Sequence, residues 1–94
     1  MENIEKGDLL NAHKHSFSNK DEILESAVCG CFHCIKIFRP NEITAWIEEI
    51  SENMETAKCP FCGIDSVVGD KSGYPLTIDF LKSMHNAFFL DWLI

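Results

Sequence analysis

Two short stretches, Cys31-Phe32-His33-Cys34 and Cys59-Pro60-Phe61-Cys62-Gly63, decide how this chain folds. Each stretch places two cysteines three positions apart, so that a tight turn can aim both sulfurs at one point. A zinc ion takes four sulfur ligands at about 2.3 Å in a tetrahedron, and two Cys-x-x-Cys pairs are a common way to supply them. The sequence therefore predicts one Zn²⁺ site with the ligands Cys31, Cys34, Cys59 and Cys62.

The predicted zinc site is structural rather than catalytic. All four ligands are thiolates, which leaves no open coordination position for a substrate or an activated water. Backbone N–H groups within each turn are expected to donate to the sulfurs, and Gly63 can adopt the positive φ that ends such a turn. A closed site contributes folding free energy. We therefore expect a structural metal and no catalytic residues.

Cys29 and His33 leave alternatives to this ligand set. With five cysteines, the chain has one thiol more than the site needs. Cys29 can replace Cys31 as a ligand, act as a redox-sensitive residue or remain a free thiol, and the free thiol is favoured. His33 lies inside the first pair and becomes a ligand only if one cysteine is released.

Length and composition indicate one small ordered domain. Of the 94 residues, 46% are hydrophobic and 24% are charged, a balance that argues against disorder. A domain of this size has a modest core, so a bound metal adds considerably to its stability. Residues 1–12 have a weak apolar pattern broken by Gly7 and predict a flexible N-terminal arm, whereas residues 13–94 predict a single zinc-binding domain.

The charge of the chain argues against a nucleic-acid partner. Lys and Arg number 8 against 15 Asp and Glu, which gives a formal net charge of −7. Four thiolates around one Zn²⁺ add about −2 to this charge. The basic residues are scattered, whereas proteins that neutralise phosphates usually cluster them. The expected partner is another protein, bound through an acidic or apolar face.

The sequence also predicts a cytoplasmic protein. Residues 1–6 are polar and acidic, unlike the start of a signal peptide, and no apolar run of about 18 residues is present to span a bilayer. In a reducing compartment, cysteines bind metals more often than they form disulfides. Oligomeric state is not predicted by these patterns.

Hydrophobic periodicity predicts short helices and strands. A helix is expected from Ser18 or Asn19 to residue 28, and a second one over residues 43–50, where Ile43, Trp46, Ile47 and Ile50 share one face. Trp46 is expected to pack in the core. A final helix is expected to begin at Thr77 and to run to the C-terminus. Strands are expected at residues 35–38 and 64–68, and residues 55–58 are expected to be extended.

Several polar residues outside the cysteine pairs are candidates for a functional role. His13, His15 and His85 are more consistent with solvated or packed side chains than with metal ligands. Asp65-Ser66 and residues 72–75 either line a small site beside the second pair or serve as turn residues, and the turn is favoured. The apolar residues from Phe88 to the C-terminus either complete the core or form a partner surface.

Three catalytic interpretations explain less of the sequence. Dithiol redox chemistry through Cys59 and Cys62, as in glutaredoxin-like proteins, needs a helix that begins at the first cysteine, but Gly63 and a predicted strand follow the pair. A zinc deaminase needs His-x-Glu and Pro-Cys-x-x-Cys motifs, and both are missing. A zinc-stapled nuclease of the His-Asn-His type needs a histidine base, for which His13, His15 and His85 are the candidates.

Two longer segments carry a resemblance to a family. The first is Cys29-Gly30-Cys31-Phe32-His33-Cys34 with residues 37–43 and Trp46, and the second is residues 56–67 with residues 72–77. Through these segments the chain resembles an uncharacterised family of small bacterial and phage cytoplasmic proteins with two zinc-type cysteine pairs, and the resemblance covers roughly residues 13–89. The resemblance implies a zinc-ribbon-like fold and a cytoplasmic location, and it implies no activity.

Together these observations predict an α+β fold of the zinc-ribbon kind, with two metal-binding turns, short antiparallel strands and two to three helices. The alternative is a treble clef, in which the second cysteine pair opens a helix. The expected function is that of a non-enzymatic adaptor or regulator that binds another protein. The alternatives are a nucleic-acid-associated regulator and an enzyme, the latter through Cys59 and Cys62 or through His13, His15 or Asp65.

Overall fold

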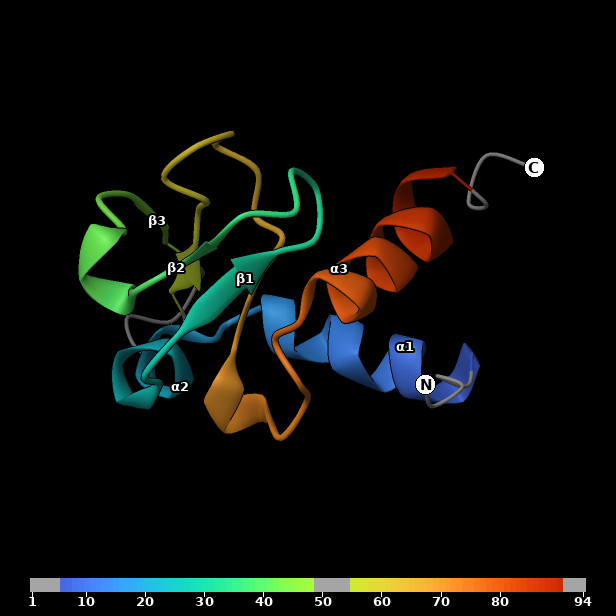
Figure 1. Ribbon diagram of the computed structural model, residues 1–94. Coiled ribbons are helices and arrows are strands. Elements are labelled where there is room, and N and C mark those ends of the chain that lie inside the picture. The colour runs from blue at the N-terminus through green and yellow to red at the C-terminus, as the bar shows by residue number, and fades with distance from the viewer. Residues whose placement is uncertain (1–5, 49–54, 91–94) are drawn as a thin grey trace.

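A three-stranded antiparallel sheet lies at the centre of the computed structural model, which describes residues 6–48 and 55–90 (Figure 1). The middle strand β1 (Cys29–Cys31) pairs with β2 (Ile37–Phe38) on one side and with β5 (Val67–Gly69) on the other. A second, two-stranded antiparallel sheet is formed by β3 (Trp46–Ile47) and β4 (Thr56–Ala57). The fold is therefore α+β with short antiparallel strands, as the sequence predicts.

Helices flank this central sheet. They are α1 (Lys6–His13), α2 (Lys20–Glu25) and α3 (Ile78–His85), and a π-helical turn, Asn86–Leu90, continues α3. Single 3-10 turns lie at Lys14–Ser16, Pro40–Glu42 and Asp70–Ser72. Within the described residues, every helix is too short or too polar to cross a membrane.

The sheet separates two hydrophobic clusters because neighbouring residues of a strand point to opposite faces. Val67 and Cys31 belong to the first cluster, whereas the adjacent Val68 and Phe32 belong to the second. The first cluster contains the cysteine pairs and is completed by Ile23, Cys29, Phe38, Ile43, Ala57 and partly buried Trp46. The second cluster joins α1 and α3 to the sheet and contains Leu9, Ala12, Phe80, Leu81 and Met84. In Figure 1, α1 and α3 lie together on the side of the sheet away from β3.

The start of α3 agrees with the sequence prediction. Thr77 has extended backbone angles, and its hydroxyl oxygen accepts a hydrogen bond from the N–H of Phe80 at 3.1 Å. This bond satisfies one of the backbone donors that a helix leaves free at its N-terminus. Phe80, Leu81 and Met84 are buried, as the apolar pattern predicts. Trp92 and Leu93 lie outside the described residues.

The prediction of a helix over residues 43–50 is wrong for the described residues 43–48. A 3-10 turn ends at Glu42, and the chain then runs extended into β3, where Trp46 pairs with Ala57 and Ile47 with Thr56. Ile43 and Ile47 are β-branched and Trp46 is aromatic, and such residues favour strands when a partner strand is available. Trp46 packs against the first cluster, as predicted. Ile50 lies outside the described residues.

The first two helices also differ from the sequence predictions. Residues 6–12, predicted as part of a flexible arm, lie in α1, with Leu9 and Ala12 buried in the second cluster. The helix α2 ends at Glu25, three residues early, because the Ser26 hydroxyl donates to the carbonyl of Glu22 at 2.8 Å. Neither Ser18 nor Asn19 caps α2 with its side chain.

The Asn19 amide instead links three parts of the fold. Its Nδ2 donates to the carbonyls of His15 and Val67, each at 2.8 Å, and its Oδ1 accepts from the N–H of Ala57 at 3.1 Å. Asn19 is buried, so these bonds replace the water that its amide loses on folding. They hold α2 against β4 and β5, the strands on either side of the second cysteine pair.

Candidate metal centre

The two cysteine pairs form turns of the same backbone geometry. In the first turn, the N–H of Ile35 donates to the carbonyl of Cys31 at 2.9 Å, and in the second the N–H of Gly63 donates to that of Cys59 at 2.9 Å. The N–H of Cys31 is bonded to the carbonyl of Lys36, and that of Cys59 to the carbonyl of Ile64, again at 2.9 Å in each case. In both turns, the carbonyl of the first cysteine therefore accepts a hydrogen bond from the N–H four residues later.

The residue after each pair has a positive φ. Gly63 has φ 79°, as predicted, and Ile35 has φ 63°. This region is strained for a β-branched residue and free of strain for glycine. The same turn therefore forms in both places, although only one of the two sequences supplies a glycine for it.

The four cysteine sulfurs converge on one point. Cys31 Sγ lies 3.6 Å from Cys62 Sγ, and Cys34 Sγ lies 3.7 Å from Cys59 Sγ. All four sulfurs lie within 4.8 Å of one another. Sulfurs placed 2.3 Å from a central ion at the corners of a tetrahedron are about 3.8 Å apart. The spacing suits a metal ion, and all five cysteines are free of disulfides.

Backbone and side-chain groups orient the sulfurs. The N–H of His33 donates to Cys31 Sγ at 3.4 Å, and the N–H of Phe61 donates to Cys59 Sγ at 3.3 Å. The buried Ser66 places its hydroxyl 3.1 Å from Cys31 Sγ. Such outer contacts fix the direction in which a ligand atom points. Sequence reasoning found the N–H donors from the turn type but missed the role of Ser66, which depends on how β5 pairs with β1.

Protonation of the thiols depends on this crowded geometry. Burial raises the pKa of Cys34 from the usual 9.0 to about 11; the N–H of Lys36 opposes this rise and the nearby Cys31 adds to it. Burial also raises the pKa of Cys62. Burial also acts to raise the pKa of Cys59. Hydrogen bonds from the N–H groups of Cys62 and Phe61 and from the Cys34 and Cys62 thiols outweigh it, so that the pKa of Cys59 is lowered. Several thiolates are thus unfavourable together unless a cation lies among them.

Cys29 and His33 lie outside the four-sulfur group. Within the described residues, Cys31, Cys34, Cys59 and Cys62 are the only group of three or more candidate ligands so close together. Cys29 is buried in the first cluster, and burial, helped by the Asp70 carboxylate, raises the pKa of its thiol to about 12. The His33 ring packs edge-on against Phe89 at 4.7 Å between ring centres.

The remaining histidines are not brought together. His15 Nδ1 contacts Glu22 Oε1 at 2.9 Å, and His85 Nδ1 donates to the carbonyl of Phe32 at 3.1 Å. His13 stacks against Phe88 at 4.3 Å between ring centres. The three side chains therefore serve different parts of the fold, and no shared histidine site is present among the described residues.

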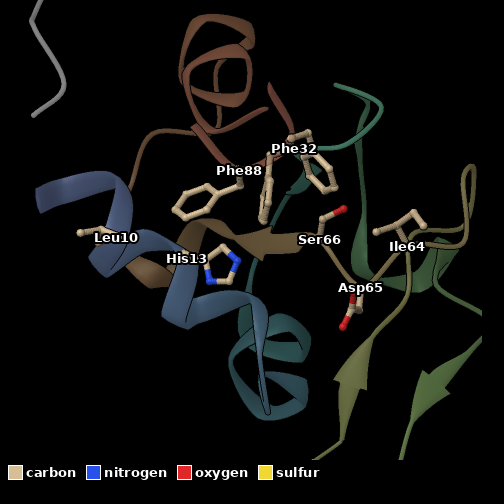
Figure 2. A pocket seen from close by; sticks show the side chains of 8 residues that line it. Leu10, His13, Phe32, Ile64, Asp65, Ser66 and Phe88 are labelled. Atoms are coloured by element: carbon tan, nitrogen blue, oxygen red, sulfur yellow. The ribbon is translucent and has the colours of Figure 1, made fainter. Parts of the chain in front are cut away.

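A pocket of about 460 Å³ lies beside the four-sulfur group (Figure 2). Its lining residues come from α1, from the two cysteine turns and the chain after them, and from the turn Asn86–Leu90: Leu10, His13, Phe32, Ile64, Asp65, Ser66, Phe88 and Phe89. The sequence pattern favours a turn role for Asp65 and Ser66 over the lining of a small site, whereas the structure places both in the lining of this pocket. Residues 72–75 are not among those that line it.

Comparison with known proteins does not identify the chain. No protein-family model matches it, and neither the curated proteins nor the solved structures that were searched include a significant match.

Proposed function

We propose that this chain is a structural zinc protein in which Cys31, Cys34, Cys59 and Cys62 hold one Zn²⁺. The observation that carries this proposal is the convergence of the four sulfurs within 4.8 Å. Four thiolates in a tetrahedron suit zinc, and they leave no coordination position for a substrate. Gly63 and the approach to β5, rather than a helix, follow the second pair, which favours a zinc-ribbon-like fold over a treble clef. Membership of the family that the sequence resembles stays a prediction.

The proposed role is that of a cytoplasmic adaptor or regulator that binds another protein without catalysis. Several large apolar side chains are exposed on the described surface: Leu10, Phe17, Leu24, Ile37, Phe61, Ile64, Ile78 and Leu90. Exposed apolar side chains of this kind supply the contact area of protein interfaces. The net charge of −7 favours a partner with a basic surface.

The alternatives explain less of the geometry. A nucleic-acid regulator is disfavoured by the charge of −7. The lowered pKa of Cys59 suits a redox dithiol. However, the two cysteine turns place their sulfurs next to each other, Cys31 beside Cys62 and Cys34 beside Cys59, and dithiol chemistry does not require this second cysteine pair. A nuclease of the His-Asn-His type needs a histidine base that acts together with a metal-binding partner, whereas His13, His15 and His85 contact different parts of the fold.

Native mass spectrometry of the reduced protein tests the metal. We expect a mass increase that corresponds to one Zn²⁺ per chain, and we expect a strong chelator to remove it together with the folded charge-state distribution, because metal binding and folding are coupled. A folded, metal-free protein under the same conditions would contradict the proposal and would favour the redox dithiol.

Two cysteine variants serve as a matched pair for this test. Cys59→Ser should lose zinc and much of the fold, because three thiolates and a hydroxyl bind zinc far less tightly. Cys29→Ala should keep one Zn²⁺ per chain, since Cys29 is buried but outside the four-sulfur group. Zinc content that is unchanged in Cys59→Ser, or lost in Cys29→Ala, would overturn the ligand assignment.

Site-specific photo-crosslinking tests the adaptor role. A photoreactive phenylalanine analogue at position 61, where the side chain is exposed, should give one discrete cross-linked protein in cells. The same analogue at position 17 tests another exposed apolar site. The captured protein should then bind the purified zinc form saturably. If none of the eight exposed apolar positions yields a partner that binds in purified form, the adaptor role is wrong.

A further inference from the structure

The pocket beside the cysteine turns has the size of a small-molecule site. Its volume of about 460 Å³ falls within the range of roughly 300–1,000 Å³ that is typical of such sites. In Figure 2, His13 and Phe88 lie on one side of the pocket, and Ile64 and Asp65 lie on the other. The pocket thus lies between the helical part of the fold and the chain that follows the second cysteine pair.

Aromatic rings dominate the inner surface of this pocket. The ring centres of Phe32 and Phe88 are 6.0 Å apart, those of Phe32 and Phe89 are 5.8 Å apart, and His13 stacks on Phe88 at 4.3 Å. Leu10 and Ile64 add aliphatic surface and remain 54% and 37% exposed. This surface suits an apolar, ring-sized group, and the negatively charged faces of the rings also attract cations.

The Asp65 carboxylate supplies a charge at the pocket. Among the described residues, the ion pairs are His15 with Glu22 and Lys20 with Glu55, and neither pair involves Asp65. The Ser66 hydroxyl is already engaged by Cys31 Sγ at 3.1 Å. Besides the His13 imidazole, Asp65 is therefore the polar side chain of the pocket that is available for a ligand, and a group that pairs with its carboxylate has to be cationic.

We propose that this pocket binds a small organic cation, with an apolar body of about one aromatic ring against Phe32 and Phe88 and an ammonium group paired with Asp65. The overall charge of −7 favours the approach of such a cation. An anion of the same shape meets the Asp65 carboxylate and is excluded. This proposal does not depend on the adaptor role, although Leu10 and Ile64 belong both to the pocket and to the exposed apolar side chains.

Nuclear magnetic resonance titration with a matched pair of probes tests the site. The probes are 2-phenylethylamine, which is an ammonium ion near neutral pH, and 3-phenylpropanoate, which joins a similar apolar body to a carboxylate. With the purified, metal-bound protein, the amine should shift the methyl signals of Leu10 and Ile64 saturably. The carboxylate should bind at least tenfold more weakly. Equal affinity of the two probes, or shifts remote from the pocket, would overturn the proposal.

Charge variants separate ion pairing from general attraction to an acidic protein. Asp65→Asn keeps the shape of the side chain and should weaken amine binding at least fivefold, and it should remove most of the preference over the carboxylate. Glu25→Gln makes the same change in net charge at an exposed residue of α2 that does not line the pocket, and it should leave binding unchanged. Equal effects of the two variants would contradict a specific pair with Asp65.

A third probe distinguishes a small molecule from a protein segment. It is a short peptide, blocked at both ends, in which phenylalanine precedes lysine. If this peptide shifts the pocket methyl signals and the free amine does not, the pocket serves a basic protein segment and the small-molecule proposal is wrong. Binding of the amine at equal or higher affinity than the peptide supports the proposal.

Discussion

Ile35 occupies a backbone position that its side chain disfavours. It follows the first cysteine pair at φ 63°, and Gly63 follows the second pair at φ 79° with the same hydrogen bonds around it. A left-handed conformation costs an L-residue about 1–2 kcal/mol. Ile35 packs partly buried against the second hydrophobic cluster, and this burial offsets the strain. The first turn thus gains packing and the second gains an unstrained backbone.

Replacement of Gly63 tests the backbone requirement of the second turn. A Cβ at Gly63 would meet no atom within 4 Å, so the cost of Gly63→Ala is conformational and not steric. We expect the free energy of unfolding of the metal-bound protein to fall by about 1–2 kcal/mol. Urea denaturation followed by circular dichroism measures this change.

Gly7→Ala is the matched control for Gly63. Gly7 lies within α1, and a Cβ there also meets no atom within 4 Å. Because alanine is the better helix former, this variant should gain about 0.5–1 kcal/mol. Unchanged stability of Gly63→Ala would show that the positive φ of Gly63 is not what the turn requires.

At the scale of elements, α1 shows how packing creates a helix that the sequence pattern does not predict. Of residues 7–13 in this helix, Leu9 and Ala12 are the buried ones, and both belong to the cluster that contains α3 residues. A helix of eight residues is marginal in isolation, so tertiary contacts must supply most of its stability. The prediction of a flexible arm followed from the weak apolar pattern of residues 1–12, which does not show what α1 packs against.

Two neighbouring leucines test whether α1 is packed. Leu9 is 9% exposed and Leu10 is 54% exposed. Leu9→Ala should lower the free energy of unfolding by about 2–3 kcal/mol, because it leaves a cavity between α1 and α3. Leu10→Ala should change it by less than about 0.5 kcal/mol. Thermal denaturation of both variants gives the comparison, and equal stabilities would mean that α1 contributes no packing.

At the scale of the whole molecule, the sheet couples the four-sulfur group to the helices. Cys31 and Val67 contribute to the cluster that contains the four sulfurs, and the adjacent Phe32 and Val68 contribute to the cluster that contains α1 and α3. The strands β1 and β5 cannot separate on one face without losing contacts on the other. Loss of metal should therefore unfold both sides of the sheet in one transition.

Chelator titration with two reporters tests this coupling. Trp46 packs against the first cluster and reports on that side through its fluorescence, in a Trp92→Phe background that leaves it as the only tryptophan. Far-ultraviolet circular dichroism reports on the helices. We expect the two signals to change together as the metal is removed. Loss of the Trp46 signal with retained helical signal would show that the two clusters fold separately.

Local features of the fold were predictable from the sequence because they depend on residues close together in the chain. The spacing of the cysteines predicts the two turns, Gly63 predicts the positive φ and Thr77 predicts the start of α3. The apolar residues between 35 and 38 predict a short strand, and β2 forms at Ile37–Phe38, although Phe38 is the buried residue and Ile37 is exposed. In each case the deciding contacts span only a few residues.

Only the tertiary structure decided the features that depend on distant partners. Residues 43–47 have apolar spacing that fits a helix, but β4 lies beside them and their backbone pairs as a strand. The contact of Ser66 with Cys31 spans 35 residues, and the bond from Asn19 to Val67 spans 48. The sequence by itself thus determined the cysteine turns and the helix start, because short loops close at low entropic cost. The packing of α1, the strand at Trp46 and the pocket at Asp65 arise only once the assembled fold supplies their partners.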